Sequence, residues 1–78
     1  MQHVEAVLDL EMNTIEVEIY GLGEGDIYIL DDHNRLVDYV PVCGTVSYFT
    51  FMCPPVSGDY MLVISCSDYY GVGCFNVE

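Results

Sequence analysis

The segment Thr14-Ile15-Glu16-Val17-Glu18-Ile19-Tyr20 places apolar side chains at odd positions and two glutamates and a tyrosine at even positions. Successive side chains of a β-strand point to opposite faces, so the segment predicts a strand with Ile15, Val17 and Ile19 buried. A strand with one apolar and one wet face is typical of an antiparallel sheet that packs against a second layer.

Residues 4–12, just before this segment, also alternate. Their even positions, from Val4 to Met12, are all apolar, and most of their odd positions are acidic. A helix through Val4, Val7 and Leu8 is the alternative, but five consecutive even positions favour a strand. We therefore expect the even side chains, up to and including Met12, to face the interior.

Five more apolar or aromatic runs follow, separated by turn residues. Four of these runs have side chains that we expect to face inward. They are Ile27 and Ile29 in 26–31, Val37, Tyr39 and Leu36 in 35–42, Tyr60, Leu62 and Ile64 in 59–66, and Phe75 and Val77 in 71–78. The fifth run, 45–52, is almost wholly apolar. Asparagine, glycine and proline fill the connections at 11–13, 21–25, 32–34 and 54–58. Seven short strands about ten residues apart predict an all-β, immunoglobulin-like Greek-key sandwich, one domain over residues 1–78.

The charge of the chain excludes several classes of function. Among 78 residues there are 13 acidic side chains, no lysine and one arginine, Arg35, which gives a formal net charge of −12. A nucleic-acid binder needs a basic surface, and an anionic membrane would repel this chain. No apolar run approaches the roughly 20 residues of a membrane span, so we expect no membrane insertion. No signal peptide pattern is visible.

Several motifs, in their order along the chain, resemble one family. They are Val4-Glu5-Ala6-Val7-Leu8-Asp9, Asn13-Thr14-Ile15-Glu16-Val17, Gly25-Asp26-Ile27-Tyr28-Ile29-Leu30-Asp31, Leu36-Val37-Asp38, Pro55-Val56-Ser57-Gly58-Asp59-Tyr60-Met61-Leu62-Val63-Ile64 and Tyr70-Gly71-Val72-Gly73-Cys74-Phe75-Asn76-Val77. Together they resemble a family of small exported Bacteroidetes proteins of unknown function with an immunoglobulin-like sandwich. The resemblance implies export to the periplasm, the cell surface or the medium, with a signal peptide upstream of these residues. It implies no catalytic residues.

A second, more distant resemblance concerns the pattern Gly-x-Tyr-x-Leu-x-Ile, which begins at Gly58. The C-terminal sorting tails of the type IX secretion system contain a similar pattern, which implies a structural or sorting appendage of a larger surface protein. Those tails usually carry lysines near the end, whereas this chain ends Asn76-Val77-Glu78.

Gly58 and Tyr60 have a structural interpretation. Gly58 ends the proline-rich connection, and Tyr60 begins the next strand. In many Greek-key sandwiches a tyrosine at such a corner returns its hydroxyl to the preceding loop while its ring fills the core. We expect Tyr60 to do the same.

Four cysteines, Cys43, Cys53, Cys66 and Cys74, allow three pairings. Cys43 and Cys53 flank a strand of about 26 Å, too long for a bridge. Cys66 and Cys74 flank the last hairpin, but they face opposite ways unless a bulge intervenes. Cys53–Cys66 and Cys43–Cys74 stay open. We expect at least two free thiols and no zinc site, because the chain lacks Cys-x-x-Cys and both histidines are distant from the cysteines in sequence.

Carboxylates gather around one hairpin, at Asp26, Asp31, Asp32 and Asp38, with Asn34 between them. Such oxygen ligands suit calcium, although the spacing of an EF-hand is absent. The favoured interpretation is that they are solvated turn and edge residues that prevent the sheet from pairing with neighbours.

We expect no catalytic residues and no cofactor. Glu16 and Glu18 share a face of one strand, whereas a hydrolase needs its carboxylates across a cleft. The glycines at 21, 23 and 25 lack the lysine and the helix N-terminus of a phosphate-binding loop.

The chain is rich in tyrosine, and alternation places Tyr20, Tyr28, Tyr69 and Tyr70 on wet faces or loop tips. Surface tyrosines are common in binding sites for proteins and sugars. The favoured interpretation of these four tyrosines is that they cover cross-strand neighbours in a small domain, and a binding role is the alternative. The sequence therefore predicts a non-catalytic interaction or adhesion module with a protein or glycan partner, or an appendage of a larger surface protein.

Overall fold

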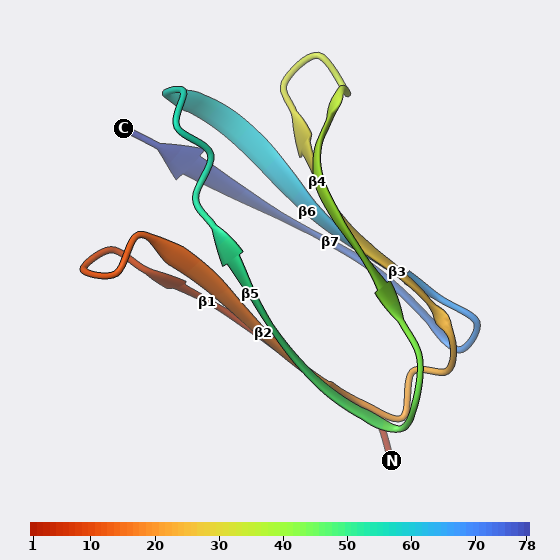
Figure 1. Ribbon diagram of the computed structural model, residues 1–78. Helices are drawn as coiled ribbons and strands as arrows, with labels where there is room; N and C mark the ends of the chain where they lie inside the picture. Colours follow the sequence, from red (N-terminus) through yellow and green to blue (C-terminus); the bar gives the residue numbers. More distant parts are fainter.

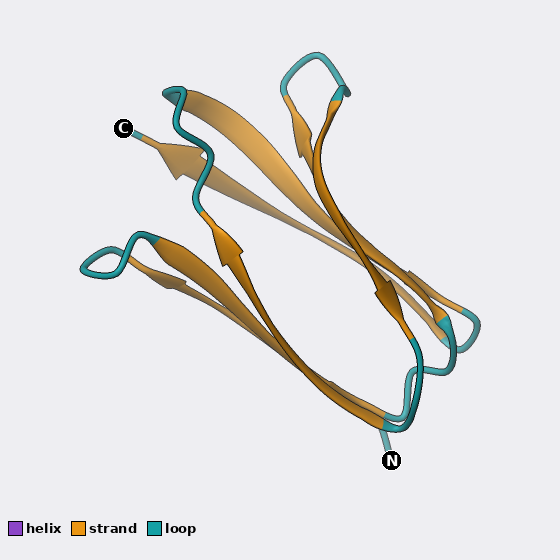
Figure 2. Cartoon of the chain, in the orientation of Figure 1, coloured by secondary structure: helices purple, strands orange, loops and turns teal.

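A computed structural model describes the backbone of residues 1–78 and the side chains other than that of Val46. The described chain is all-β (Figure 2). Its seven strands are β1 (His3–Asp9), β2 (Thr14–Tyr20), β3 (Gly25–Asp31), β4 (Leu36–Val42), β5 (Val46–Met52), β6 (Gly58–Cys66) and β7 (Tyr69–Val77). The strands expected from alternation are confirmed, with shifts of a few residues at their ends.

The strands form two antiparallel sheets that face each other (Figure 1). The small sheet has the order β1-β2-β5, and the large sheet has the order β4-β3-β6-β7. The chain passes from one sheet to the other after β2, β4 and β5. The predicted β-sandwich is thereby confirmed, and its immunoglobulin-like classification stays a prediction.

The core lies between the sheets. Ile15, Val17 and Ile19 are buried on the inner face of β2, as the alternation predicts. The large sheet covers them with further buried side chains, which are Ile27, Ile29, Val42, Tyr60, Leu62 and Ile64. Burying apolar side chains from both sheets supplies most of the driving force for folding.

The glycine-rich connection between β2 and β3 contributes an unexpected core residue, Leu22. Gly21 and Gly23 take positive φ angles of 72° and 79°, a conformation that favours glycine. Between them Leu22 is only 2% exposed, and its carbonyl accepts a hydrogen bond from the Asp68 backbone N–H at 3.0 Å. This connection therefore closes one end of the sandwich.

The prediction that the even side chains of residues 4–12 face the interior is wrong at the C-terminal end of this segment. β1 stops at Asp9, and Leu10 and Met12 are exposed, Leu10 by 81%. The Asp9 carboxylate accepts the backbone N–H groups of Glu11 and Met12 at 3.0 and 3.1 Å. This side chain stabilises a turn where the alternation predicts that the strand continues.

The predicted inward face of 35–42 is also wrong. Leu36, Val37 and Tyr39 are exposed, whereas Val42 is buried and Val40 packs against the core. The pairing of β3 with β4 shifts between Ile29 and Leu30, which is a bulge-like irregularity. The shift sets Leu36 opposite Leu30 on the outer face. Tyr39 lies outside for a different reason: in the regular part of the ladder Val40 and Val42 take the core side, so their neighbour Tyr39 faces outward.

Tyr60 behaves as predicted. Its hydroxyl donates to the Val56 carbonyl in the preceding loop, while its ring is buried and stacks on Phe75 with centroids 5.6 Å apart. Gly58, two residues earlier, has a φ of 151°, which favours glycine at this corner.

Tyr60→Phe is expected to keep the fold and to lower the free energy of unfolding by about 1 kcal/mol, because one hydrogen bond is lost while the ring remains. Urea unfolding followed by circular dichroism measures the change. Tyr70→Phe, at an exposed position, is the control and should leave stability unaltered. A Tyr60→Phe variant as stable as the wild type would contradict a stabilising role for this hydrogen bond.

All four cysteines, which lie in the described part of the chain, are free thiols. Pairing of β6 with β7 sets Cys66 opposite Tyr69 and Cys74 opposite Met61. The two cysteines are thus five pairs apart along the hairpin, about 17 Å, which excludes a bridge between them. The expectation of at least two free thiols is confirmed.

Candidate functional site

The outer face of the large sheet carries a band of apolar side chains across all four strands. One row of cross-strand neighbours runs from Tyr39 through Tyr28 and Val63 to Val72. The next row runs from Leu36 through Leu30 and Met61 to Cys74. We call these eight residues the apolar face: Tyr28, Leu30, Leu36, Tyr39, Met61, Val63, Val72 and Cys74.

The centre of the apolar face is packed and its margins are exposed. Val63 lies on the outer side of β6 but is only 3% exposed, because its neighbours cover it. Tyr39 is 52% exposed, and Leu36 and Val72 are also exposed. An antiparallel sheet commonly turns a polar face to water, so the apolar outer face makes this side of the large sheet the candidate functional site.

The outer face of the small sheet is different in kind. It carries Glu5, Glu16 and Glu18 on neighbouring strands. The His3 imidazole lies 3.0 Å from the Glu18 carboxylate, and the hydroxyl of Tyr48 on β5 donates to Glu16. The outer face of the small sheet thus mixes these acidic side chains with exposed Val7, Tyr48 and Met52, whereas the large sheet carries two uncharged rows across all four strands.

Carboxylates border the apolar face at both ends. The Tyr39 hydroxyl donates to Asp26 at 2.8 Å, and this hydrogen bond raises the pKa of Tyr39, as does partial desolvation. At the other end the Asn76 amide donates to the Asp59 carboxylate at 2.9 Å. The only cation besides the N-terminus and the histidines, Arg35, binds Asp31, so the face has an acidic border.

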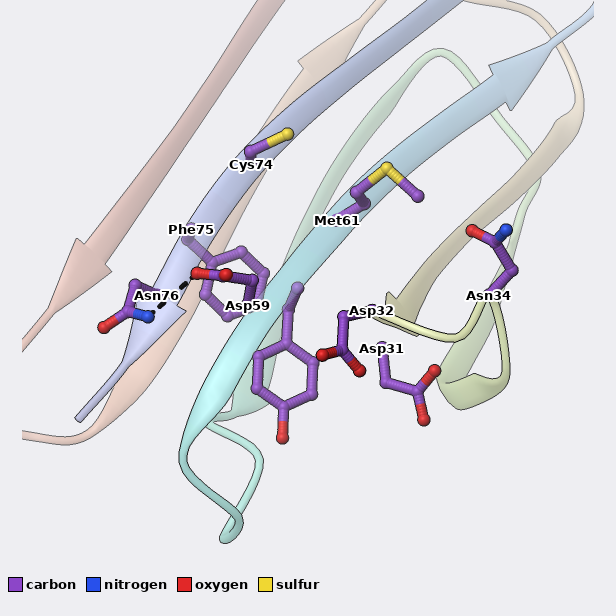
Figure 3. Close-up of a pocket in the computed structure, with 9 residues that line it drawn as sticks. Asp31, Asp32, Asn34, Asp59, Met61, Cys74, Phe75 and Asn76 are labelled. Carbon is purple, nitrogen blue, oxygen red and sulfur yellow. Dashed lines mark hydrogen bonds between the residues drawn. The ribbon is translucent and has the colours of Figure 1, made fainter.

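A shallow hollow of ≈ 530 Å³ lies at the Asp59 end (Figure 3). Asp31 and Asp32 line it from the β3–β4 turn, and it shares Met61 and Cys74 with the apolar face. Asp59 and Asn76 point toward each other, joined by the hydrogen bond already described. The hollow therefore concentrates negative charge beside the apolar face.

The structure places the four predicted binding tyrosines in three different environments. Tyr28 belongs to the apolar face, and Tyr70 is exposed in the adjoining row, opposite Ser65. Tyr20 lies on the other sheet. Tyr69 packs against the core, so its predicted wet position is wrong. Only two of the four come together.

Two members of the apolar face were not expected from the sequence, Val63 at its centre and Tyr39 at its β4 margin. Tyr39 was expected inside, but it pairs in regular register with Tyr28 on the outer face, while its neighbour Val40 takes the core side. The uninterrupted apolar run Tyr60-Met61-Leu62-Val63-Ile64 is a signal for the face, because such a run is typical of a strand covered on both sides.

The four calcium candidates do not form one site. Asp26 pairs with Pro41 near one end of the β3–β4 hairpin and Asp38 pairs with Ile29, whereas Asp31 and Asp32 lie at the turn. Five residues of extended strand separate Asp26 from Asp31, which is about 17 Å.

Asp31 and Asp32 lie within 4.8 Å of His33, measured between possible ligand atoms. The Asp31 carboxylate is already engaged, however. It accepts the backbone N–H groups of His33 and Arg35, both at 2.9 Å, and the Arg35 Nε at 2.9 Å. The hydrogen bond from the Arg35 backbone contributes most to lowering the pKa of Asp31, so the group is a fully ionised turn-stabilising carboxylate at neutral pH. These contacts explain Asp31 without a metal ion.

No protein family, curated protein or solved structure matches this chain. The resemblance to exported Bacteroidetes proteins therefore stays a prediction. Among the described residues there is no helix with the length and apolarity needed to cross a membrane.

Proposed function

We propose that this domain is a non-catalytic interaction module that binds a protein partner through the apolar face. The observation that supports this proposal is the continuous band of apolar side chains from Tyr39 to Val72. This band lies on the outer face of the large sheet, whose inner face already forms the core. Export, as the family resemblance implies, is part of this proposal; the alternative is that the domain is a structural or sorting appendage of a larger surface protein.

The chemistry of the face favours a partner with an apolar centre and a basic rim. Its middle offers aliphatic side chains and rings, which another apolar surface covers at a gain in free energy. Its ends carry Asp26, Asp59 and the carboxylates of the β3–β4 turn, which complement lysine or arginine. A partner with this pattern also relieves the repulsion within a chain of net charge −12.

A protein suits this face better than a glycan does. A sugar brings many hydroxyl groups, and each one that is buried without a hydrogen-bond partner costs free energy. The apolar face offers few polar atoms for them, and the Tyr39 hydroxyl already donates to Asp26.

Site-specific photo-crosslinking tests the proposal. Tyr39 and Tyr48 form a matched pair: they are 52% and 59% exposed, each donates its hydroxyl to a carboxylate, and they lie on opposite outer faces. Each is replaced in turn by p-benzoylphenylalanine, and the protein is irradiated with extract or surface fractions of its source cells. A discrete protein adduct from position 39, absent from position 48, is the expected result.

Two results would overturn the proposal. Equal adducts from positions 39 and 48 would mean that the apolar face has no special role. Binding on a glycan array that Tyr39→Ser abolishes, with no protein adduct from position 39, would mean that the face binds sugar.

A further inference from the structure

The strand β7 (Tyr69–Val77) forms one edge of the large sheet and pairs only with β6. An edge strand presents unpaired backbone N–H and C=O groups to any other strand that approaches. Proteins usually protect such edges with charged side chains, proline or bulges. β7 has nine residues, keeps one regular register with β6 and contains no charged residue and no proline.

The other edges differ from β7. β4 carries Asp38, Pro41 and the register shift, and β1 carries Glu5 and Asp9. The sequence of β5 is uncharged too, but its neighbour β2 projects Glu16 and Glu18 from the outer face. β7 is thus the one edge where both the strand and the middle of its neighbour, Met61 to Ser65, are neutral.

The inner side of β7 contains an unfilled place at Gly73. Apart from Gly73 and its two chain neighbours, no atom of the described residues lies within 4 Å of where a Cβ on Gly73 would be. Beside it lies a hollow of ≈ 200 Å³ between β1 and β7, whose lining residues include Ala6, Leu8, Leu62 and the chain's own Phe75. An apolar side chain on an added strand opposite Gly73 would enter this hollow.

β7 itself offers such a side chain. Phe75 is two residues from Gly73 and points to the same face. When two β7 strands pair antiparallel with Cys74 opposite Cys74, each Phe75 lies opposite Gly73 of the partner subunit. The two strands are related by a two-fold axis, so one Phe75 ring lies at each of the two open places beside Gly73. Aromatic rings opposite edge glycines are known to stabilise strand pairs.

We propose that two copies of this chain associate by antiparallel pairing of their β7 strands, centred on Cys74. Electrostatic repulsion favours contact through β7 over contact through other surfaces. Two copies of net charge −12 repel each other wherever acidic side chains meet, and β7 contains no acidic side chain. Pairing of this kind joins two four-stranded sheets into one sheet of eight strands. The inference does not depend on the proposed function of the apolar face.

Sedimentation analysis of the full chain is the first test. We expect the average mass to rise toward that of a dimer at concentrations up to about 1 mM, a range suited to an interface of small area. Added salt should strengthen the association, since it screens repulsion between acidic copies. A chain that remains monomeric at the highest concentration and salt would overturn the proposal.

Substitutions at Cys74 test the surface and the register. Cys74→Glu places two carboxylates directly opposite each other and should weaken the dimer by at least about tenfold. Cys43→Glu adds the same charge at an exposed cysteine outside β7 and should have little effect. Mixing Cys74→Glu and Cys74→Lys chains should restore association, since opposite charges then meet; a merely misfolded variant would not show this rescue.

Oxidation tests the same register covalently. Diamide takes two electrons and two protons from two thiols, which leaves a disulfide and the corresponding hydrazine. We expect a disulfide-linked dimer in the wild type under non-reducing electrophoresis and in Cys43→Ser, but not in Cys74→Ser. A dimer linked through Cys43, or equal effects of the two glutamate variants, would contradict pairing through β7.

Discussion

Leu22→Ala is expected to lower the free energy of unfolding by about 2 to 5 kcal/mol, the usual range for truncating a buried leucine. Leu22 is 2% exposed, and it is held between two glycines whose positive φ angles aim it into the core. The truncation removes apolar contacts and leaves a cavity that the short connection cannot close. A domain of 78 residues has little stability to lose, so the variant should be largely unfolded at modest temperatures.

Leu10→Ala is the matched control, since it removes the same atoms at a position 81% exposed. Its effect should stay within about 0.5 kcal/mol. Urea unfolding of both variants against the wild type measures the difference. Alternation alone places Leu10 inside and gives no reason to expect Leu22, in a glycine-rich connection, to be buried. Equal losses, or a larger loss for Leu10→Ala, would therefore contradict the arrangement of the turn and the connection described above.

Gly25→Ala is expected to destabilise the domain by about 1 to 3 kcal/mol or more, the range for forcing extra atoms into packed structure. A Cβ at Gly25 would lie 2.1 Å from the Ser65 carbonyl oxygen and 2.5 Å from the Cys66 Cα. Both atoms belong to the backbone of β6, so no side chain can move aside. Relief requires β3 and β6 to separate where Gly25 pairs with Cys66, which breaks the end of the ladder between the two inner strands of the large sheet.

Gly73→Ala is the control for this substitution. It adds the same methyl group to a strand of the same sheet, with free space around the Cβ. Alanine also restricts the unfolded chain more than glycine does, so we expect unchanged or slightly higher stability. Thermal unfolding of dilute samples compares the two variants. A Gly25→Ala variant that melts at or above the wild-type temperature would mean that β3 and β6 are less closely packed at this point.

The sequence by itself determined the strands, and in β2, β3 and β6 it determined the buried face. The side chains expected to face inward in these strands are all buried: Ile15, Val17, Ile19, Ile27, Ile29, Tyr60, Leu62 and Ile64. All three strands lie inside their sheets with neighbours on either side, so one face of each is covered by the opposite sheet. The corner of Tyr60 follows from local chemistry, since a glycine and a tyrosine at this spacing suffice to return the hydroxyl to the loop.

Only the tertiary structure decided which face of β4 is covered, where β1 stops, and the candidate site. Alternation shows which side chains share a face, but it does not show which face a second sheet covers or where a strand stops. Leu10, Tyr39 and Tyr69 were misplaced for these reasons, and the burial of Leu22 in a connection was not predicted at all.

The apolar face needs four strands aligned in register, and these strands come from distant parts of the chain. Tyr28 and Tyr70 could be predicted to lie outside, whereas Val63 and Tyr39 could not be joined to them before the pairing of β4, β3, β6 and β7 was known. Cross-strand neighbours are set by pairing between residues far apart in sequence, and this information is absent from local periodicity.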